Sequence, residues 1–240
     1  MSDEYQIAGE YLHLLSEAAW QALRTPVTQA LRGAAGDATL VDIGAGSGLG
    51  TEVLAATVPD GDVIAVEPSP LLRAVLLSRV AAHPDLRQRV TTLAGDALGV
   101  ELPGRLGAVL AMNMIGHLDP DGRRTFLRRV AERLVPGAPL VLNLQPPAEP
   151  TPVPFTVFGE VQVGRHTYEG GGSAEPSGSA AVTWRMRYRV LDTDGAVLRE
   201  DHADYRWHVV APEVLLTEMA DAGLTGEIGA LDVVRATRRP

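Results

Sequence analysis

A glycine-rich segment between an apolar run and a helix-compatible run constrains this sequence more than any other feature. Residues 41–50 read Val-Asp-Ile-Gly-Ala-Gly-Ser-Gly-Leu-Gly, and the runs 39–43 and 49–57 flank the glycines. This order predicts a strand, a tight turn and the start of a helix. Glycines in the turn permit positive φ angles and let a ligand lie against the backbone. The N–H groups at the start of the helix would then face that ligand.

The spacing of the glycines separates two classes of ligand. A dinucleotide site has the pattern G-x-G-x-x-G, whereas here the pattern is G-x-G-x-G and Leu49 stands at the third glycine position. Glu67 lies 19 residues after Gly48, at the end of a second apolar run, 63–66. A carboxylate there can accept hydrogen bonds from both hydroxyls of a ribose. The pattern therefore disfavours an NAD-dependent reductase and favours another ligand that carries a ribose.

Short apolar runs alternate with amphipathic runs over residues 39–145. Strands are expected at 39–43, 62–66, 89–94, 107–112 and 139–144, and helices at 48–57, 69–82 and 120–134. This alternation predicts an α/β fold with a doubly wound, mostly parallel sheet and helices on both faces. Ligands of such sheets bind at the carboxyl ends of the strands, near the point where the strand order reverses. An apolar periodicity over 8–32 predicts a preceding helix that Pro26 breaks or restarts.

Composition limits the chemistry and the partners of the chain. It has no cysteine, which excludes a thiolate nucleophile and cysteine-ligated metals, and all 21 basic residues are arginines. The net charge of −9 argues against a nucleic-acid partner, because phosphate contacts need a basic surface. Without a long apolar run or a basic N-terminal region, we expect no membrane span, no signal peptide and a cytoplasmic location. No metal is expected either, and Asp119 and Asp121 are interpreted as the start of a helix.

Four segments, in order, resemble motifs of the class I (Rossmann-like) S-adenosylmethionine (SAM)-dependent methyltransferases. VDIGAGSG at 41–48 resembles motif I, and VIAVEPS at 63–69 resembles motif II. LAGDAL at 93–98 resembles motif III, and RLVPGAPLVLN at 133–143 resembles the L-x-P-G-G-x-L segment, with Gly-Ala in place of Gly-Gly. The resemblance covers about residues 39–145 and continues more weakly through 211–236. It implies a Rossmann-like sheet and SAM as the cofactor.

The resemblance also implies roles for single residues. Motif I would cradle the methionine part of SAM, Glu67 would bind the ribose hydroxyls, and Asp96 would accept from the adenine amino group. The alternative for Asp96 is an aspartate that caps its own turn. The candidate cofactor-binding residues are Asp42, Gly44, Ala45, Gly46, Gly48, Glu67, Pro68, Asp96, Ala97, Asn113, Met114 and Tyr11.

Histidine and tyrosine residues supply the candidates for chemistry at this edge. His117 follows the fourth expected strand and matches a histidine found in many relatives, so it is the leading candidate for a general base. Its alternative is a histidine that packs beside the cofactor and fixes a loop. Tyr5 and Tyr11 lie on a segment that often folds over the cofactor in relatives. Tyr11 is the preferred contact, with core packing as its alternative.

The pattern changes after Gln145, where five prolines precede β-type runs near 155–163, 181–191 and 196–209. A stretch of this length is too long for an ordinary connection. The resulting division is an N-terminal helical segment at 1–38, a SAM-binding core at 39–145, an inserted antiparallel β cap for the substrate at 146–210, and a C-terminal helix and strands at 211–240. The glycine-rich stretch 169–179 predicts a mobile loop.

Arginines alternate with apolar residues in one of these runs. Arg185, Arg187 and Arg189 interleave with Trp184, Met186, Tyr188 and Val190, which predicts a strand with one buried face. The arginine stripe is interpreted as a solvated strand face. A cationic wall for an anionic substrate is the alternative.

The leading functional hypothesis is a SAM-dependent methyltransferase that modifies O, N or C of a small molecule in specialised metabolism. Two alternatives keep the SAM site, namely a cyclisation or rearrangement without methyl transfer, and a non-catalytic SAM-binding protein. Measurement of S-adenosylhomocysteine formation separates them from the leading hypothesis. The acceptor, the base and the oligomeric state cannot be read from the sequence, although relatives often form homodimers.

Overall fold

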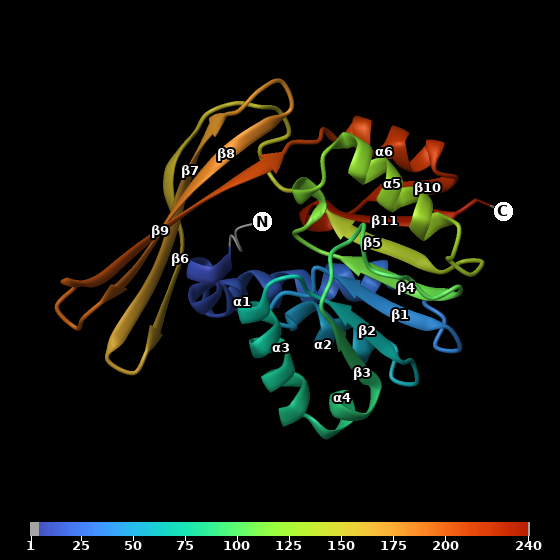
Figure 1. The fold of residues 1–240 in the computed structure, drawn as a ribbon, viewed down its shortest axis with the longest axis horizontal. Coiled ribbons are helices and arrows are strands. Elements are labelled where there is room, and N and C mark those ends of the chain that lie inside the picture. Colours follow the sequence, from blue (N-terminus) through green and yellow to red (C-terminus); the bar gives the residue numbers. More distant parts are fainter. Residues whose placement is uncertain (1–4, 240) are drawn as a thin grey trace.

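The computed structural model describes residues 5–239, which form a seven-stranded sheet and a separate four-stranded sheet (Figure 1). The larger sheet has the strand order β10-β11-β5-β4-β1-β2-β3. Its parallel strands are β1 (Thr39–Ile43), β2 (Val63–Val66), β3 (Val90–Leu93), β4 (Leu106–Ala111) and β5 (Pro139–Asn143). Two antiparallel strands, β10 (Leu224–Ile228) and β11 (Val233–Arg238), complete one edge. The predicted α/β class, with a mostly parallel sheet and an added antiparallel one, is confirmed.

Helices cover both faces of the larger sheet. They are α1 (Tyr5–Ala30), α2 (Leu49–Thr57), α3 (Pro70–Ala82), α4 (Pro84–Arg89), α5 (Pro120–Ala131) and α6 (Pro212–Asp221), with short 3-10 turns η1 (Ile115–His117) and η2 (Ala230–Asp232). The sequence patterns did not predict α4, which is only six residues long. None of the helices within residues 5–239 has the length and apolar composition needed to cross a bilayer.

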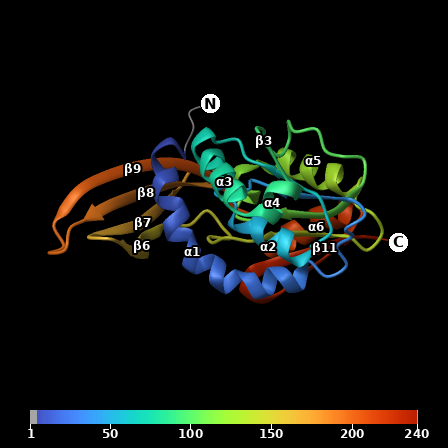
Figure 2. The ribbon, with the colours of Figure 1, turned by 90° about the horizontal axis from the view of Figure 1, so that it is seen from below.

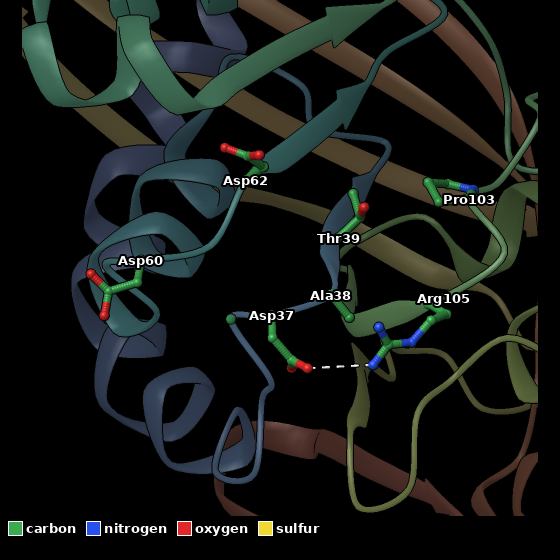
Figure 3. A pocket seen from close by; sticks show the side chains of 8 residues that line it. Asp37, Ala38, Thr39, Asp60, Asp62, Pro103 and Arg105 are labelled. Carbon is green, nitrogen blue, oxygen red and sulfur yellow. Dashed lines mark hydrogen bonds and ion pairs between the residues drawn. The ribbon is translucent and has the colours of Figure 1, made fainter.

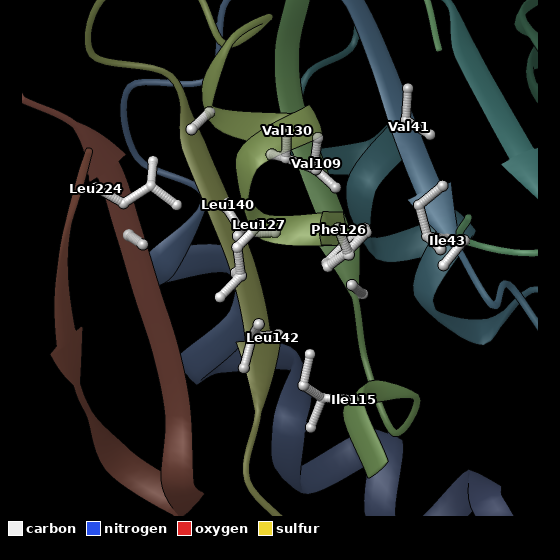
Figure 4. Packing of buried hydrophobic residues seen from close by; sticks show 14 of the residues in the cluster. Val41, Ile43, Val109, Ile115, Phe126, Leu127, Val130, Leu140, Leu142 and Leu224 are labelled. Atoms are coloured by element: carbon white, nitrogen blue, oxygen red, sulfur yellow. The ribbon is translucent and has the colours of Figure 1, made fainter. Parts of the chain in front are cut away.

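The buried side chains of β4 and β5 point alternately to the two helical layers. Val109 and Leu140 pack with Phe126 of α5 in one cluster, which Figure 4 shows together with Leu127 and Val130. Their neighbours Leu110 and Val141 belong instead to the cluster that α1, α2 and α3 cover. Because both faces are buried, these strands read as continuous apolar runs rather than alternating ones. This packing fixes the strand ends that carry the candidate site.

The helix α1 runs from the four-stranded sheet along the larger sheet, and it is continuous through Pro26 (Figure 2). The predicted break at Pro26 is therefore wrong. Proline lacks the N–H that would bond one turn back and usually kinks a helix. Here Leu23 and Val27 lie on either side of it and are both buried in the sheet-facing cluster. Their packing stabilises the helical path across the proline.

The second sheet is antiparallel and consists of β6 (Val153–Val163), β7 (His166–Pro176), β8 (Ala181–Leu191) and β9 (Val197–His208) in sequence order. The mobile loop predicted at 169–179 is wrong, because most of that stretch is β7, which pairs with both β6 and β8. Its glycines are buried beneath neighbouring side chains. A Cβ at Gly170 would lie 2.5 Å from Cδ1 of Leu15, and one at Gly171 would lie 2.5 Å from Cζ of Phe155. The glycines thus allow close packing.

The arginine stripe of β8 lies on the sheet face that points away from α1. Met186 and Tyr188 pack with α1, and side chains alternate along a strand, so the arginines lie opposite. Arg187 forms an ion pair with Glu169 at 3.4 Å, and Arg189 forms one with Glu200 at 2.6 Å. The stripe is therefore partly neutralised by its neighbours, and a cationic wall at the α1 face is excluded.

Candidate functional site

The candidate site lies where the strand order of the larger sheet reverses, at the carboxyl ends of β1 and β4. The chain leaves β1 through residues 44–48 and leaves β4 through residues 112–117. These two loops touch, since a Cβ at Gly44 would lie 3.2 Å from Cβ of Met114. Parallel sheets bind their ligands at such a crevice. The topology therefore brings the two most suggestive segments of the sequence together.

The glycine loop has the backbone conformation that its sequence predicts. Gly44, Gly46 and Gly48 have φ angles of 71°, 56° and 91°, in the region that favours glycine. Gly48 is the N-cap of α2 and carries no side chain that could cap the helix. The loop is anchored from below, because the N–H groups of Gly44 and Ala45 donate to the carbonyl of Val66 at 2.9 and 3.0 Å. The result is a rigid turn that opens onto a helix N-terminus.

Glu67 joins this loop to the segment after β2. Its Oε2 accepts from the N–H of Gly46 at 2.8 Å, and its Oε1 accepts from the N–H of Ser69 at 2.8 Å. The side chain is 3% exposed. The next residue, Pro68, presents its carbonyl to Arg73 at 3.0 Å. The carboxylate expected to bind ribose thus lies directly against the glycine loop.

Asp42 lies behind the loop rather than on it. It is 2% exposed in β1, and its Oδ2 accepts from the hydroxyl of Thr51 in α2 at 2.6 Å. Burial raises the pKa of Asp42 to about 7. Asp42 thus links β1 to α2 through a buried hydrogen bond. Its expected part in cofactor binding stays a prediction.

Asp96 follows β3 and is exposed, while the adjacent Ala97 is buried. Its Oδ1 accepts from the N–H groups of Leu98 at 2.9 Å and Gly99 at 2.7 Å. These are the contacts expected of a turn-capping aspartate. A carboxylate has further acceptor capacity, so the cap is compatible with a bond to an adenine amino group.

Asn113 pairs with a residue that the sequence patterns did not single out. Its N–H donates to Oδ1 of Asn143 at 2.7 Å, and Nδ2 of Asn143 donates to its Oδ1 at 2.7 Å. Asn113 has a φ of 55°, which asparagine tolerates better than most residues. Asn143 ends β5, and the adjacency of parallel strand ends was the signal that could have found it. The pair holds the loop after β4 near its start.

His117 ends the 3-10 turn η1 and lies among aromatic side chains. Its ring centroid is 5.0 Å from that of Trp207 and 6.0 Å from that of Tyr205, both on β9, and the hydroxyl of Tyr5 lies 2.6 Å from its Nε2. The ring is still accessible to solvent. Desolvation by these neighbours lowers the pKa of His117 to about 4. The imidazole is therefore neutral at pH 7.

The structure places Tyr5, rather than Tyr11, beside His117. Tyr11 is fully buried, and its ring stacks on that of Tyr188 at a centroid distance of 4.9 Å. Its hydroxyl donates to Oδ2 of Asp201 at 2.5 Å and accepts from Nη2 of Arg199 at 2.6 Å. This is the packing alternative for Tyr11, and the contact with SAM stays a prediction. The sequence patterns missed Tyr205 and Trp207, which only the fold brings to His117.

A cavity of about 260 Å³ lies at the opposite ends of the strands from the candidate site, near the amino ends of β1 and β2 (Figure 3). Asp37, Asp60, Asp62 and Arg105 line it, and Arg105 approaches Asp37 to 3.4 Å. The glycine loop is absent from its lining residues. Parallel sheets bind ligands at the carboxyl ends of their strands, so this cavity is not the candidate site. Within residues 5–239, no group of three or more His, Cys, Asp or Glu side chains is arranged to hold a metal.

Comparison with known proteins adds a domain assignment and a fold. Residues 40–137 match the family model described as a methyltransferase domain. No curated protein matches the sequence. The chain is similar in structure to CalS10, an amino pentose methyltransferase from Micromonospora echinaspora, with a TM-score of 0.73, 23% identity and 92% of each chain covered.

Two further solved structures agree over all or nearly all of the chain. The Streptomyces venezuelae protein DesVI has a TM-score of 0.76 at 17% identity, with 100% of each chain covered. The sugar N-methyltransferase KedS8 from Streptoalloteichus has a TM-score of 0.68 at 20% identity, with 98% of this chain and 93% of that chain covered. At these identities the similarity shows a shared fold. The four-stranded sheet is part of that fold, since the coverage extends beyond the matched domain.

Proposed function

We propose that this chain, a class I SAM-dependent methyltransferase by its domain match and its fold, methylates an amine nitrogen of a small-molecule acceptor. The observation that carries the proposal is the neutral His117, which lies among aromatic rings at the end of the loop that meets the glycine turn. The structural relatives include an amino pentose methyltransferase and a sugar N-methyltransferase, which supports a sugar amine in specialised metabolism.

The residues present fit SAM as the methyl donor. The helix start after Gly48 suits a carboxylate, and Glu67 suits a diol because each carboxylate oxygen can accept more than one hydrogen bond. Asp96 lies after β3, where it can accept from an adenine amino group. When bound, SAM supplies an electrophilic methyl group on a sulfonium. The protein must then align the acceptor with that methyl group and exclude water.

The surroundings of His117 favour an amine over a hydroxyl acceptor. In the transfer, the nitrogen lone pair forms a bond to the methyl carbon, the carbon–sulfur bond breaks, and sulfur keeps the electron pair. The methylated nitrogen, now positively charged, then loses one proton to water. Loss of water around the bound acceptor disfavours the charged ammonium form and so favours the nucleophilic amine. A histidine with a pKa of about 4 is a weak base for a hydroxyl, whereas an uncharged amine needs no base to attack the methyl group.

The face of the four-stranded sheet that packs on α1 supports a neutral acceptor. It carries Tyr168, Trp184, Tyr188 and Tyr205, while the arginines of β8 lie on the other face. We propose residues 146–210 as the acceptor cap, because β9 contributes both aromatic rings nearest to His117 apart from Tyr5. The cysteine-free sequence is compatible with the cytoplasm, which we propose as its location.

A matched pair of acceptors tests this proposal. The purified protein is incubated with SAM and either an amino sugar or the same sugar with a hydroxyl in place of the amine, and S-adenosylhomocysteine and methylated product are quantified by mass spectrometry. We expect turnover of the amine alone, with a rate that rises with pH as the acceptor loses its proton. Methylation of the hydroxyl sugar alone would contradict the proposal, as would SAM-dependent conversion without S-adenosylhomocysteine. His117→Phe should lower the rate without weakening SAM binding.

A further inference from the structure

An arginine of α3 holds the outer side of the glycine loop. Arg79 donates from Nε to the carbonyl of Ser47 at 3.0 Å and from Nη1 to Oε1 of Glu52 at 2.7 Å. Its stem covers the loop as well, because a Cβ at Gly48 would lie 3.1 Å from its Cδ and 2.7 Å from Cδ1 of Leu76. The Arg79 side chain is only 17% exposed. One arginine therefore links the middle of the loop to the first turn of α2.

A histidine of α1 also contacts Ser47 and Arg79. Nδ1 of His13 lies 3.2 Å from Oγ of Ser47, and both ring nitrogens of His13 lie 3.2 Å from Nη2 of Arg79. Burial and the charge of Arg79 lower the pKa of His13, while Glu17 and Glu52 act in the opposite direction. The neutral ring can accept a hydrogen bond from the guanidinium. Both the carbonyl and the hydroxyl of Ser47 are thus held by side chains from outside the loop.

We propose that Arg79, supported by His13, is a positioning residue for SAM binding. It acts by holding Ser47, and so the turn from Gly46 to Gly48, in the conformation that receives the ligand. Glycines lose more conformational freedom on ordering than other residues. A loop that is already ordered binds more tightly, since the ligand does not have to order it. The inference rests on the proposed function, because it concerns the same SAM site.

The direct test is calorimetric titration of SAM into the wild type and the variants Arg79→Gln, Arg79→Lys and His13→Ala. We expect the Kd of SAM to rise about 10-fold in Arg79→Gln and about 3-fold in His13→Ala. Arg79→Lys should recover only part of the affinity, because an ammonium cannot span the carbonyl of Ser47 and the carboxylate of Glu52 as the planar fork does. In turnover assays the KM for SAM should rise while kcat and the KM for the acceptor stay near the wild-type values.

Arg89 provides a matched control. It also donates to carbonyl oxygens, those of Gly61 at 2.7 Å and Ala55 at 3.1 Å, but it does not contact the glycine loop. Arg89→Gln should lower Tm and leave the Kd of SAM unchanged. The inference is overturned if Arg79→Gln and His13→Ala are folded and bind SAM as tightly as the wild type, or if Arg89→Gln weakens binding equally. Failure of the wild type to bind SAM would instead overturn the proposed function, and the inference with it.

Discussion

The glycine loop after β1 and the glycine run in β7 show two opposite uses of the same residue. In the loop, Gly46 and Gly48 have positive φ angles, and the absence of a side chain allows a turn that other residues rarely adopt. In β7, Gly170 and Gly171 lie in a paired strand, and the absence of a side chain lets Leu15 and Phe155 pack closely. Glycine density alone therefore does not indicate mobility. The backbone conformation and the neighbouring side chains determine the role of each glycine.

The same contrast separates the two halves of the candidate site. The cofactor side is built mainly by the backbone conformation of the glycine loop and by Glu67, which lies 19 residues after Gly48. The acceptor side is built by side chains that converge from α1, η1 and β9. If this division holds, variants on the two sides should separate SAM affinity from acceptor turnover.

The largest effect is expected from a β-branched residue in the loop. Gly48→Val places a side chain at a φ of 91° and brings Cβ within 2.7 Å of Leu76. We expect SAM binding to weaken by about 100-fold or more, measured by calorimetry. Gly104→Val is the control, since a Cβ there has no heavy atom within 4 Å. Equal SAM affinity in Gly48→Val and the wild type would show that the turn is not part of the site.

The second prediction tests the chemistry of the cofactor side. Glu67→Gln replaces a carboxylate oxygen with an amide NH₂ that cannot accept from Gly46 or a ribose hydroxyl. Hydrogen bonds to a charged group are worth about 1.5–3 kcal/mol, so SAM affinity should fall by about 10- to 100-fold. Asp96→Asn should fall within the same range if it reads the adenine, and unchanged affinity would leave Asp96 as a turn cap alone.

The division also explains how much could be predicted from sequence. The βα alternation and the glycine loop are patterns among residues that are close in sequence. The strand bounds and the class of fold could therefore be predicted. Tyr205 and Trp207 lie far along the chain from His117, and nothing local marks them as its neighbours. The predicted helix break at Pro26 and the predicted mobile loop at 169–179 were wrong for the same reason. In both places, packing against other elements overrides the local preference of the proline or the glycines. Local signals therefore predicted the conformation of the glycine loop better than the side chains that surround His117.

The third prediction concerns the acceptor side. The indole of Trp207 packs so closely on η1 that a Cβ at Gly116 would lie 1.9 Å from its Cε2. Trp207→Leu removes this support and one of the rings beside His117. We expect kcat/KM for the acceptor to fall about 10-fold, with the Kd of SAM within about 2-fold of the wild type. The wild type and variant are compared by turnover and calorimetry. An equal loss of SAM affinity in the variant would show that the cofactor side and the acceptor side are not independent.

The last prediction concerns pH, where the two sides should differ in sign. Burial raises the pKa of Asp42 to about 7, so the folded protein holds more protons than the unfolded chain between pH 4 and 7. Stability from this group is present at low pH and is lost as pH rises through about 7. His117 acts oppositely. Its pKa is lowered to about 4, so the unfolded chain holds more protons and stability rises between about pH 4 and 6.5.

Asp42→Asn separates these two contributions. Asn can still accept from the hydroxyl of Thr51, but it never becomes charged in the core. Relative to the wild type, the unfolding free energy of the variant should be about 2–3 kcal/mol higher at pH 8 than at pH 5, because only the wild type loses stability as Asp42 approaches its raised pKa. The cost of burying the new amide NH₂ is the same at both pH values and cancels from this difference. Denaturant titrations without SAM at both values measure this difference. An equal offset at pH 5 and pH 8 would mean that Asp42 ionises normally in β1.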